Sequence, residues 1–314
     1  MLALGEDDAL GRVLPWEQLQ DMAVAADEGG LDSVWGADHL IFRPKQGTSH
    51  GIHECWTILT GVAAVTRRVE IGPLVLALPF RNPALVAKMA TALDEVSGGR
   101  LVLGLGCGWH EPEFDAFDFP FDHRVGRFEE ALQIVLPLLR EGHVTFEGRW
   151  HRADAELLPP GPRPGGPPIL IAGKGPRMMQ LVARHADQWN AAWFGMPEEA
   201  TELAERIERQ REACTAEGRD PATLQLTAGI FVTFPHLLAQ GTGEQPPDEA
   251  ISGDVDHVAA ALAGYAMHGV EHLMVHLWPR NAAAVTELAR AAEMARAAEM
   301  ARAAEMARAA PALR

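Results

Sequence analysis

The chain has 314 residues, of which 47% are hydrophobic, and its 43 acidic against 27 basic residues give a net charge of −16. Such an acidic surface repels nucleic acid and anionic membranes, so we expect neither as a partner, and an anionic ligand would need a local basic cluster. Cys55, Cys107 and Cys214 are widely spaced, which is typical of a reduced compartment. The N-terminus resembles no signal peptide, and no segment approaches the roughly 20 apolar residues of a spanning helix, so we expect a cytoplasmic protein.

Short apolar segments alternate with helical patterns over most of the chain. Residues 16–30 place apolar side chains at helical spacing and stop at Gly-Gly, and Pro83 stands near the start of a later helix. Asp254 is expected to cap another helix. In chain order we expect strands at 2–5, 31–39, 69–78, 100–106, 168–173, 187–193, 224–234 and 270–278, and helices at 16–30, 54–66, 82–99, 126–140, 176–186, 197–217 and 254–269.

The expected strands carry nearly continuous apolar runs, which indicates a parallel sheet covered on both faces. Eight strands alternating with helices fit a closed (β/α)8 barrel, the TIM-barrel fold. Insertions are expected after strand four, where residues 144–153 have hairpin character, and after strand seven, where residues 237–253 form a polar loop. The alternative is an open doubly wound sheet, which usually carries a glycine fingerprint after its first strand. No such fingerprint follows residues 2–5, and this first strand is itself short.

The C-terminal end is a repeat in which AAEMAR occurs three times in succession from Ala291 to Arg308. A six-residue step turns a helix by about 240° net, so the repeated methionines face three directions and form no coiled-coil seam. The alanine content favours a helix, with Glu–Arg pairs three residues apart. We therefore divide the chain into a barrel at 1–290 and a solvated helical tail at 291–314.

Residues with chemical potential follow the expected strands at their carboxyl ends, where barrels of this type build their active sites. Asp38 and His39 end the second strand, and an imidazole there is a candidate general acid or base. The segment AGKGP (172–176) leads straight into a helix. Its glycine backbone and the helix N-terminus, together with Lys174 and Arg177, outline a phosphate site.

Other reactive side chains near these strand ends favour simpler roles. Cys107 lies between two glycines, which favours a small residue packed against a ligand over a covalent nucleophile. Glu111 and Glu113 are expected to be solvated loop carboxylates, although either could act as a general acid or base. No metal is expected, because His272 and His276 share a strand face without a third ligand nearby.

Several segments together resemble the luciferase-like monooxygenase superfamily, in particular its coenzyme F420-dependent oxidoreductase branch. The resemblance covers most of residues 30–195 in the order and spacing of the family. It implies a (β/α)8 barrel with a flavin or deazaflavin ring across its C-terminal mouth. The matching segments are GLDSVWGADHL (30–40), the stretch from ECWTILTG to DAFDFPF (54–121), RFEEALQIVLPLLREG (127–142) and PPILIAGKGPRMMQLVARHADQWN (167–190).

The resemblance also implies roles for residues around the ring. A bulge in the third strand, often with a non-prolyl cis peptide, would support the ring, and the glycines beside Cys107 would make room for it. His39 would be catalytic, while Trp109 and His110 would form part of the substrate pocket wall. The residues implied to bind the cofactor are Asp38, Leu74, Val75, Ala77, Cys107, Gly108, Lys174, Gly175, Arg177 and Met178.

Three positions depart from the family pattern. Trp109 stands where glucose-6-phosphate dehydrogenases of this superfamily have a proton-transferring glutamate, which argues against a sugar-phosphate substrate. His110 replaces an asparagine that many relatives have, and Lys174 replaces a glycine, which would strengthen phosphate binding or narrow the loop.

The resemblance predicts an oxidoreductase that transfers hydride between the deazaflavin coenzyme F420 and a small organic substrate. One alternative is an FMN-dependent monooxygenase of the same fold. A second is a protein that binds a flavin or deazaflavin without turnover. The sequence is also compatible with a homodimer.

Overall fold

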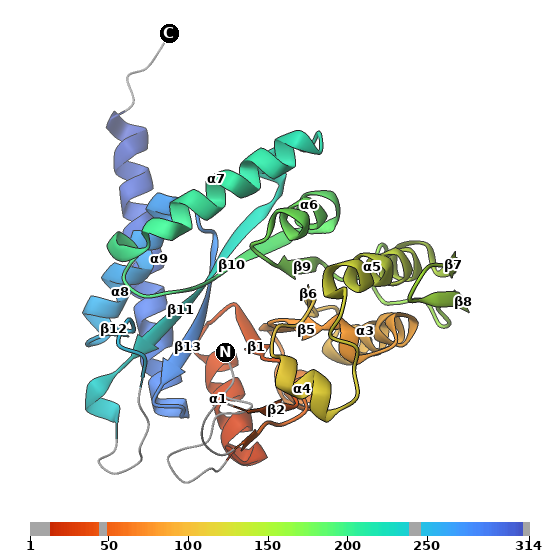
Figure 1. The fold of residues 1–314 in the computed structure, drawn as a ribbon. Coiled ribbons are helices and arrows are strands. Elements are labelled where there is room, and N and C mark those ends of the chain that lie inside the picture. The colour runs from red at the N-terminus through yellow and green to blue at the C-terminus, as the bar shows by residue number, and fades with distance from the viewer. Residues whose placement is uncertain (1–12, 44–48, 239–245, 310–314) are drawn as a thin grey trace.

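The computed structural model describes residues 13–43, 49–238 and 246–309, so the expected strand at 2–5 lies outside the described residues. Within them, strands alternate with helices that lie outside the strands (Figure 1). The elements are α1 (Trp16–Glu28), β1 (Ser33–Gly36), β2 (Ile41–Phe42), β3 (His50–Gly51), α2 (Cys55–Val65), β4 (Glu70–Pro73), β5 (Leu76–Ala77), α3 (Pro83–Ser97), β6 (Leu103–Gly106), α4 (Glu111–Ala116), α5 (Arg124–Glu141), β7 (His143–Glu147), β8 (Arg152–Glu156), β9 (Ile169–Ala172), α6 (Pro176–His185), β10 (Gln188–Phe194), α7 (Thr201–Ala216), β11 (Gln225–Thr233), β12 (Ile251–Ser252), α8 (Val255–Gly264), β13 (His272–Trp278) and α9 (Ala282–Ala309).

The main strands are parallel and follow the chain around the molecule. β1 pairs with β4, and a second path runs β5, β6, β9, β10, β11, with β13 also paired to β11. A parallel bridge between Ile71 and Leu101 connects the two paths. Parallel strands in this order, each followed by an outer helix, form the predicted (β/α)8 barrel. The strand expected at 69–78 is divided into β4 and β5 by a cis peptide between Leu74 and Val75.

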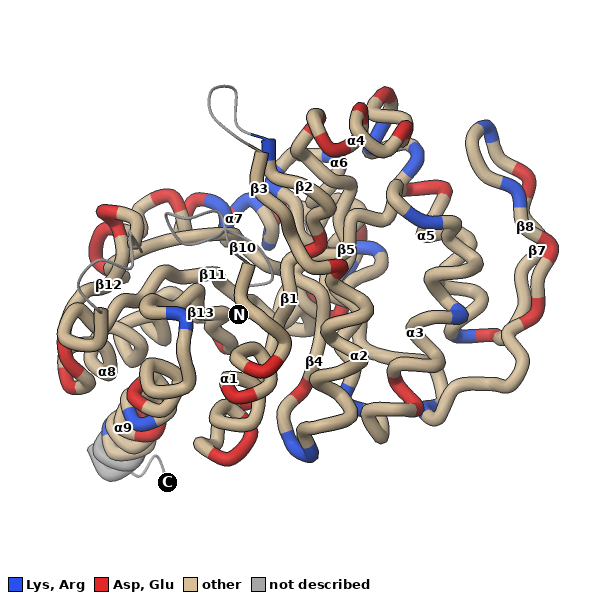
Figure 2. Tube along the Cα trace, turned by 90° about the horizontal axis from the view of Figure 1, so that it is seen from below, with Lys and Arg blue, Asp and Glu red and all other residues tan. Residues whose placement is uncertain are grey.

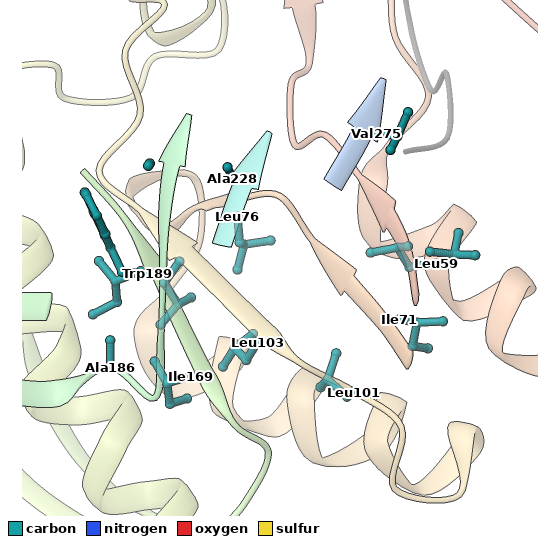
Figure 3. Packing of buried hydrophobic residues seen from close by; sticks show 14 of the residues in the cluster. Leu59, Ile71, Leu76, Leu101, Leu103, Ile169, Ala186, Trp189, Ala228 and Val275 are labelled. Carbon is teal, nitrogen blue, oxygen red and sulfur yellow. The ribbon is translucent and has the colours of Figure 1, made fainter. Parts of the chain in front are cut away.

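The main hydrophobic core lies between the strands and the helices that cover them. Ile71, Leu101, Leu103 and Ile169 come from neighbouring strands and are at most 2% exposed (Figure 3). Charged residues lie along the outer helices, whereas the trace of β11 carries none (Figure 2). This arrangement accounts for the continuous apolar strands, because a parallel sheet is buried on both faces.

β13 and β1 are brought together by side chains at their amino ends. The Trp35 indole N–H donates to Ser33 Oγ (2.7 Å), and Ser33 Oγ lies 2.8 Å from His272 Nε2. Burial lowers the pKa of His272, which favours the neutral ring that accepts the Ser33 proton. The contact joins residues 239 positions apart and links the amino end of β13 to that of β1.

The two expected insertions have different structures. β7 and β8 form the predicted antiparallel hairpin, and the Glu130 carboxylate accepts the backbone N–H groups of Arg149, Trp150 and His151 at its turn. In the second insertion, β12 pairs with β11, while residues 239–245 lie outside the described residues. Among the described helices, none combines the length and hydropathy needed to cross a bilayer.

The C-terminal helix α9 is continuous across position 290. Ala291 is fully buried and Ala295 is 6% exposed, and both belong to the main core. Arg296 pairs with Asp32 at 2.6 Å and also donates to the Gly30 carbonyl. The start of the repeat therefore packs on the barrel, which differs from the expected fully solvated tail.

We expect deletion of residues 291–314 to lower the melting temperature by roughly 2–6 °C, because it exposes the core beneath Ala291 and Ala295. Deletion of residues 303–314 alone is the matched control and should leave the melting temperature unchanged. Thermal unfolding followed by circular dichroism measures both. Equal melting temperatures for the two truncations would show that the first repeat contributes nothing.

Candidate active site

Three segments meet at the carboxyl ends of neighbouring strands. Asp38 and His39 follow β1, the residues around Ala77 end β5, and the segment 107–110 follows β6. These strands share one parallel direction, so their carboxyl ends lie at the same mouth of the barrel. The structure thus brings together the site residues predicted on the second, third and fourth strands.

Asp38 is a buried anchor for this mouth. Its side chain is 3% exposed, and Arg81 binds both carboxylate oxygens at 2.7 and 2.9 Å. The Ala77 N–H donates to Asp38 Oδ2 at 2.9 Å, and Arg81 also pairs with Glu54 at 2.6 Å. Burial raises the pKa of Asp38, and the Arg81 guanidinium opposes that rise. The carboxylate therefore fastens the end of β1 to β5 and α2.

His39 is oriented by a buried glutamate. Its Nδ1 lies 2.9 Å from Glu113 Oε1, and Glu113 Oε2 accepts the Leu40 N–H at 2.9 Å. Glu113 is 1% exposed, so the expectation of a solvated loop carboxylate was wrong for this residue. Glu111, one position before Pro112 on α4, is exposed as expected. A helix starting directly after a strand end directs one first-turn side chain toward the barrel mouth, and this is the signal that could have identified Glu113.

The imidazole of His39 can carry a proton between Glu113 and the mouth. A carboxylate at Nδ1 favours the tautomer with its proton on that nitrogen, which leaves Nε2 as an acceptor. His39 Nε2 makes no hydrogen bond to any residue in the described ranges. The arrangement is that of a general base, or of a general acid once the ring is protonated, with the glutamate as its orienting group.

Aromatic rings surround His39 on the β6 side. Phe42, Trp109 and His110 lie 5.9, 5.6 and 6.3 Å from its ring centroid, all in edge-to-face geometry. His110 stacks on Phe42 at 4.7 Å and accepts the Arg43 N–H through Nε2. Burial lowers the pKa of His110, which favours an uncharged ring at this side of the mouth. Trp109 is 61% exposed. Phe42 had no signal in the sequence, because its strand is only two residues long.

The glycines of β6 have a different role from the predicted one. A Cβ atom on Gly104 would stand 2.1 Å from the Pro73 carbonyl oxygen, and one on Gly106 would stand 2.6 Å from the Val75 side chain. These glycines therefore leave space for the backbone around the cis peptide. That peptide lies at the predicted position, Leu74–Val75. Gly104 and Gly106 thus make room for the third strand, and the room for a planar ring beside Cys107 stays a prediction.

Gly108 and Cys107 also serve packing. Gly108 has a φ of 71°, and a Cβ atom there would stand 2.5 Å from the Phe114 ring. Burial raises the pKa of the Cys107 thiol, so it is not an activated thiolate. The predicted packing of Cys107 against a ligand stays a prediction.

The loop between β9 and α6 presents its cationic side chain to solvent. Lys174 and Gly175 are exposed, and no side chain in the described ranges accepts a hydrogen bond from the first N–H groups of α6. Trp189 Nε1 donates to the Gly173 carbonyl at 2.9 Å and holds the loop on β10. The Met178 side chain is 5% exposed and packs in the core, and the implied role of Met178 in binding the cofactor stays a prediction.

Arg177 points away from the loop, toward α5. It forms an ion pair with Glu129 and lines an open pocket of about 280 Å³. The other lining residues lie around the amino end of α5 and the hairpin and are Phe121, His123, Arg124, Val125, Gly126 and Trp150. Sequence reasoning placed Arg177 beside Lys174 and missed this pocket, since the hairpin that supplies Trp150 is distant in the sequence.

Comparison with known proteins identifies the family of the chain. The model of the family "luciferase-like monooxygenase" matches residues 2–310. An F420-dependent glucose-6-phosphate dehydrogenase from Kineococcus radiotolerans is 30% identical over 82% of this chain and 86% of its own length. A phthiodiolone/phenolphthiodiolone dimycocerosates ketoreductase from Mycobacterium bovis is 30% identical over 87% of this chain and 75% of its own.

Solved structures agree on the fold. An F420-dependent secondary alcohol dehydrogenase in complex with an F420-acetone adduct aligns with a TM-score of 0.75 at 18% identity, over 90% of this chain and 96% of that one. The coenzyme F420-dependent tetrahydromethanopterin reductase from Methanopyrus kandleri aligns with a TM-score of 0.71 at 16% identity, over 88% of this chain and 94% of that one. On the match to its family model over nearly its full length, the chain belongs to the luciferase-like monooxygenase family.

Proposed function

We propose that this protein is an oxidoreductase that binds coenzyme F420 and transfers hydride between its deazaflavin ring and a small organic substrate. The observation that carries the proposal is the His39–Glu113 pair, 2.9 Å apart, at the same mouth as the Leu74–Val75 cis peptide. The names of two relatives at 30% identity, a dehydrogenase and a ketoreductase, support an exchange between a hydroxyl and a carbonyl carbon. The more distant structures support the fold.

The residues at the mouth fit a planar apolar ring. Leu74 and Val75 are partly exposed although they follow a buried strand, and both pack on a small cluster containing Trp35 and Met274. They present apolar surface that a deazaflavin ring would cover. The bound coenzyme supplies the hydride chemistry, and the protein supplies position, exclusion of water and a proton route.

The proton route runs through His39. When an alcohol is oxidised, His39 Nε2 accepts the hydroxyl proton while Glu113 holds Nδ1–H and stabilises the positive charge that forms on the ring. When a carbonyl is reduced, the protonated ring returns that proton to the substrate oxygen. Asp38 and Arg81 hold the backbone that carries His39 and take no proton.

The exposed loop before α6 is the proposed site of the coenzyme phosphate. The N–H groups at the start of α6 and the ammonium of Lys174 provide an anion site within an acidic chain. Gly175 lets the backbone approach the ligand. Arg177 contributes less to this site, because Glu129 already neutralises it.

We expect Lys174→Ala to weaken coenzyme binding by roughly 10- to 100-fold, the equivalent of one charge-assisted contact. Turnover at saturating coenzyme should stay within a few-fold, because the phosphate is remote from the reacting carbon. Arg177→Ala should weaken binding less. Arg184→Ala, at the other end of α6, is the matched control, and unchanged affinity in all three variants would remove this loop from the site.

The cofactor assignment is tested by titrating the purified protein with F420 and, separately, with FMN while absorbance is recorded. We expect saturable binding of F420, and bleaching of its band when a secondary alcohol is added. Binding of FMN with oxygen consumption would instead indicate a monooxygenase. A third outcome is that F420 binds, but no alcohol bleaches its band and no carbonyl compound restores the band of the reduced coenzyme. That result would indicate a protein that binds the coenzyme without turnover. Glucose 6-phosphate is not proposed as the substrate, because Trp109 replaces the expected glutamate.

A further inference from the structure

Four aromatic rings on β10, β11 and β13 contact one another in a row. Trp193 stacks on Phe231 with ring centroids 5.2 Å apart, and His276 stacks on Trp278 at 4.3 Å. Phe231 and His276 link the two pairs at 6.1 Å. We call these four residues the aromatic shelf. Trp193, Phe231 and His276 are partly exposed, although all three lie on central strands.

The shelf lies on the inner face of the barrel. Along β11, Ala228, Ile230 and Val232 are fully buried in the main core, so Phe231 projects to the opposite face, into the barrel. In the register of β11 and β13, Phe231 is opposite His276 and Thr233 is opposite Trp278. The shelf is therefore built from neighbouring side chains of one sheet face.

Gly229 allows Trp193 to lie flat. A Cβ atom on Gly229 would stand 2.6 Å from the Trp193 ring. β10 also changes register between Asn190 and Trp193, and Ala192 has a φ of 75° there, which turns the tryptophan toward β11. A glycine and a bulge thus combine to present a flat aromatic face inside the barrel.

Two buried polar atoms beside the shelf have no hydrogen-bond partner in the part of the chain that the structure describes. They are Thr233 Oγ1 and His276 Nε2. Buried polar atoms in native proteins are nearly always paired, and an unpaired one is costly, so two on one face indicate a missing partner. Burial, with a smaller effect of Arg280, lowers the pKa of His276 to about 3, so its ring is neutral near pH 7 and offers one donor and one acceptor nitrogen.

The shelf faces the proposed ring position across the barrel. β11 lies four strands from β5 along the hydrogen-bonded path, and four steps in an eight-stranded barrel lead to the opposite side. The Leu74–Val75 peptide and the shelf therefore approach the mouth from opposite walls. A ligand on the shelf is distinct from a ring supported by the third strand.

We propose that the aromatic shelf binds the substrate, and that this substrate is an uncharged planar aromatic compound with a hydroxyl or carbonyl oxygen. Its ring would stack on Trp193 and Phe231, while its oxygen or a second polar substituent would pair with Thr233 Oγ1 and His276 Nε2. Stacking suits an aromatic ring, and a neutral imidazole beside a hydroxyl suits an uncharged polar group. The reaction of the bound compound depends on the proposed function. Its binding depends on the aromatic shelf alone.

The test uses acetophenone as the probe and cyclohexyl methyl ketone as its saturated match in size. Calorimetric titration of the protein, with and without bound F420, gives the affinity for each ketone. We expect acetophenone to bind roughly 10-fold more tightly than the saturated ketone. Each of the variants Trp193→Leu and Phe231→Leu should lower the affinity for acetophenone by roughly 2- to 10-fold. Thr233→Val keeps all four rings and should lower the affinity for acetophenone by a similar factor. Phe117→Leu, on an exposed ring 47% accessible and away from the shelf, is the control.

Three outcomes separate this proposal from the cofactor assignment. Loss of acetophenone binding with unchanged F420 affinity supports the shelf as a substrate site. A fall in F420 affinity in the shelf variants, with acetophenone unaffected, overturns it, because the shelf would then hold the coenzyme. Equal affinities for the two ketones also overturn it. If F420 fails to bind at all, the proposed function fails, while the titrations without coenzyme still decide the shelf. Circular dichroism confirms that each variant is folded.

Discussion

Replacement of His39 by asparagine is expected to lower turnover by roughly 10²–10⁴-fold, which is the usual contribution of general acid–base catalysis. The asparagine keeps a polar side chain of similar size, so it retains a hydrogen bond toward Glu113 but has no ring nitrogen that can take up and release a proton. Coenzyme affinity should change modestly, because the proposed support of the ring is the third strand and not His39. The pH–rate profile should lose the limb that an imidazole sets.

Two companion variants sharpen this prediction. Glu113→Gln keeps an acceptor for His39 Nδ1–H but removes the charge that stabilises the protonated ring, so we expect a smaller loss of turnover and a displaced pH–rate limb. His236→Asn is the matched control, since His236 also pairs with a glutamate, Glu287, and its side chain is 51% exposed. Turnover of His39→Asn within a few-fold of the parent would remove the catalytic role. A loss of affinity with an unchanged profile would make His39 an anchor of the ring.

Replacement of Arg81 by methionine is expected to lower the free energy of unfolding by about 3–5 kcal/mol, because it leaves the Asp38 carboxylate buried without its partner. Urea unfolding followed by tryptophan fluorescence measures the loss. The pH dependence should also change: without Arg81, protonation of Asp38 becomes favourable in the folded state, so part of the loss is recovered as the pH falls.

The double variant Asp38→Asn with Arg81→Met distinguishes a buried charge from a loss of packing. It removes both charges, so its unfolding free energy should lie above that of Arg81→Met alone. Arg184→Met breaks an exposed pair with Glu217 and should leave the urea midpoint close to that of the parent. A double variant no more stable than Arg81→Met would show that Arg81 acts through packing and its contact with Glu54.

Some features of the site follow from local sequence patterns, whereas contacts between residues distant in the sequence do not. The position of His39 at a strand end follows from the apolar run before it, and the cis peptide follows from the resemblance of its segment to a family. Glu113 lies 74 positions from His39, and Arg81 lies 43 from Asp38. Neither pairing leaves a local signal, since a carboxylate in the first turn of a helix is usually solvated and an arginine after a short turn is ordinary.

The sequence by itself determined the main helices and strands and the parallel order of the strands, and it predicts which end of the barrel carries the site. Those properties depend on the spacing of apolar residues and on the rule that parallel strands end at one edge. The tertiary structure decided which side chains meet there. The glycines of β6 face the third strand, Arg177 turns to Glu129, and the shelf gathers residues from three strands. These contacts depend on register, a bulge and the packing of distant segments, and no local pattern of residues encodes them.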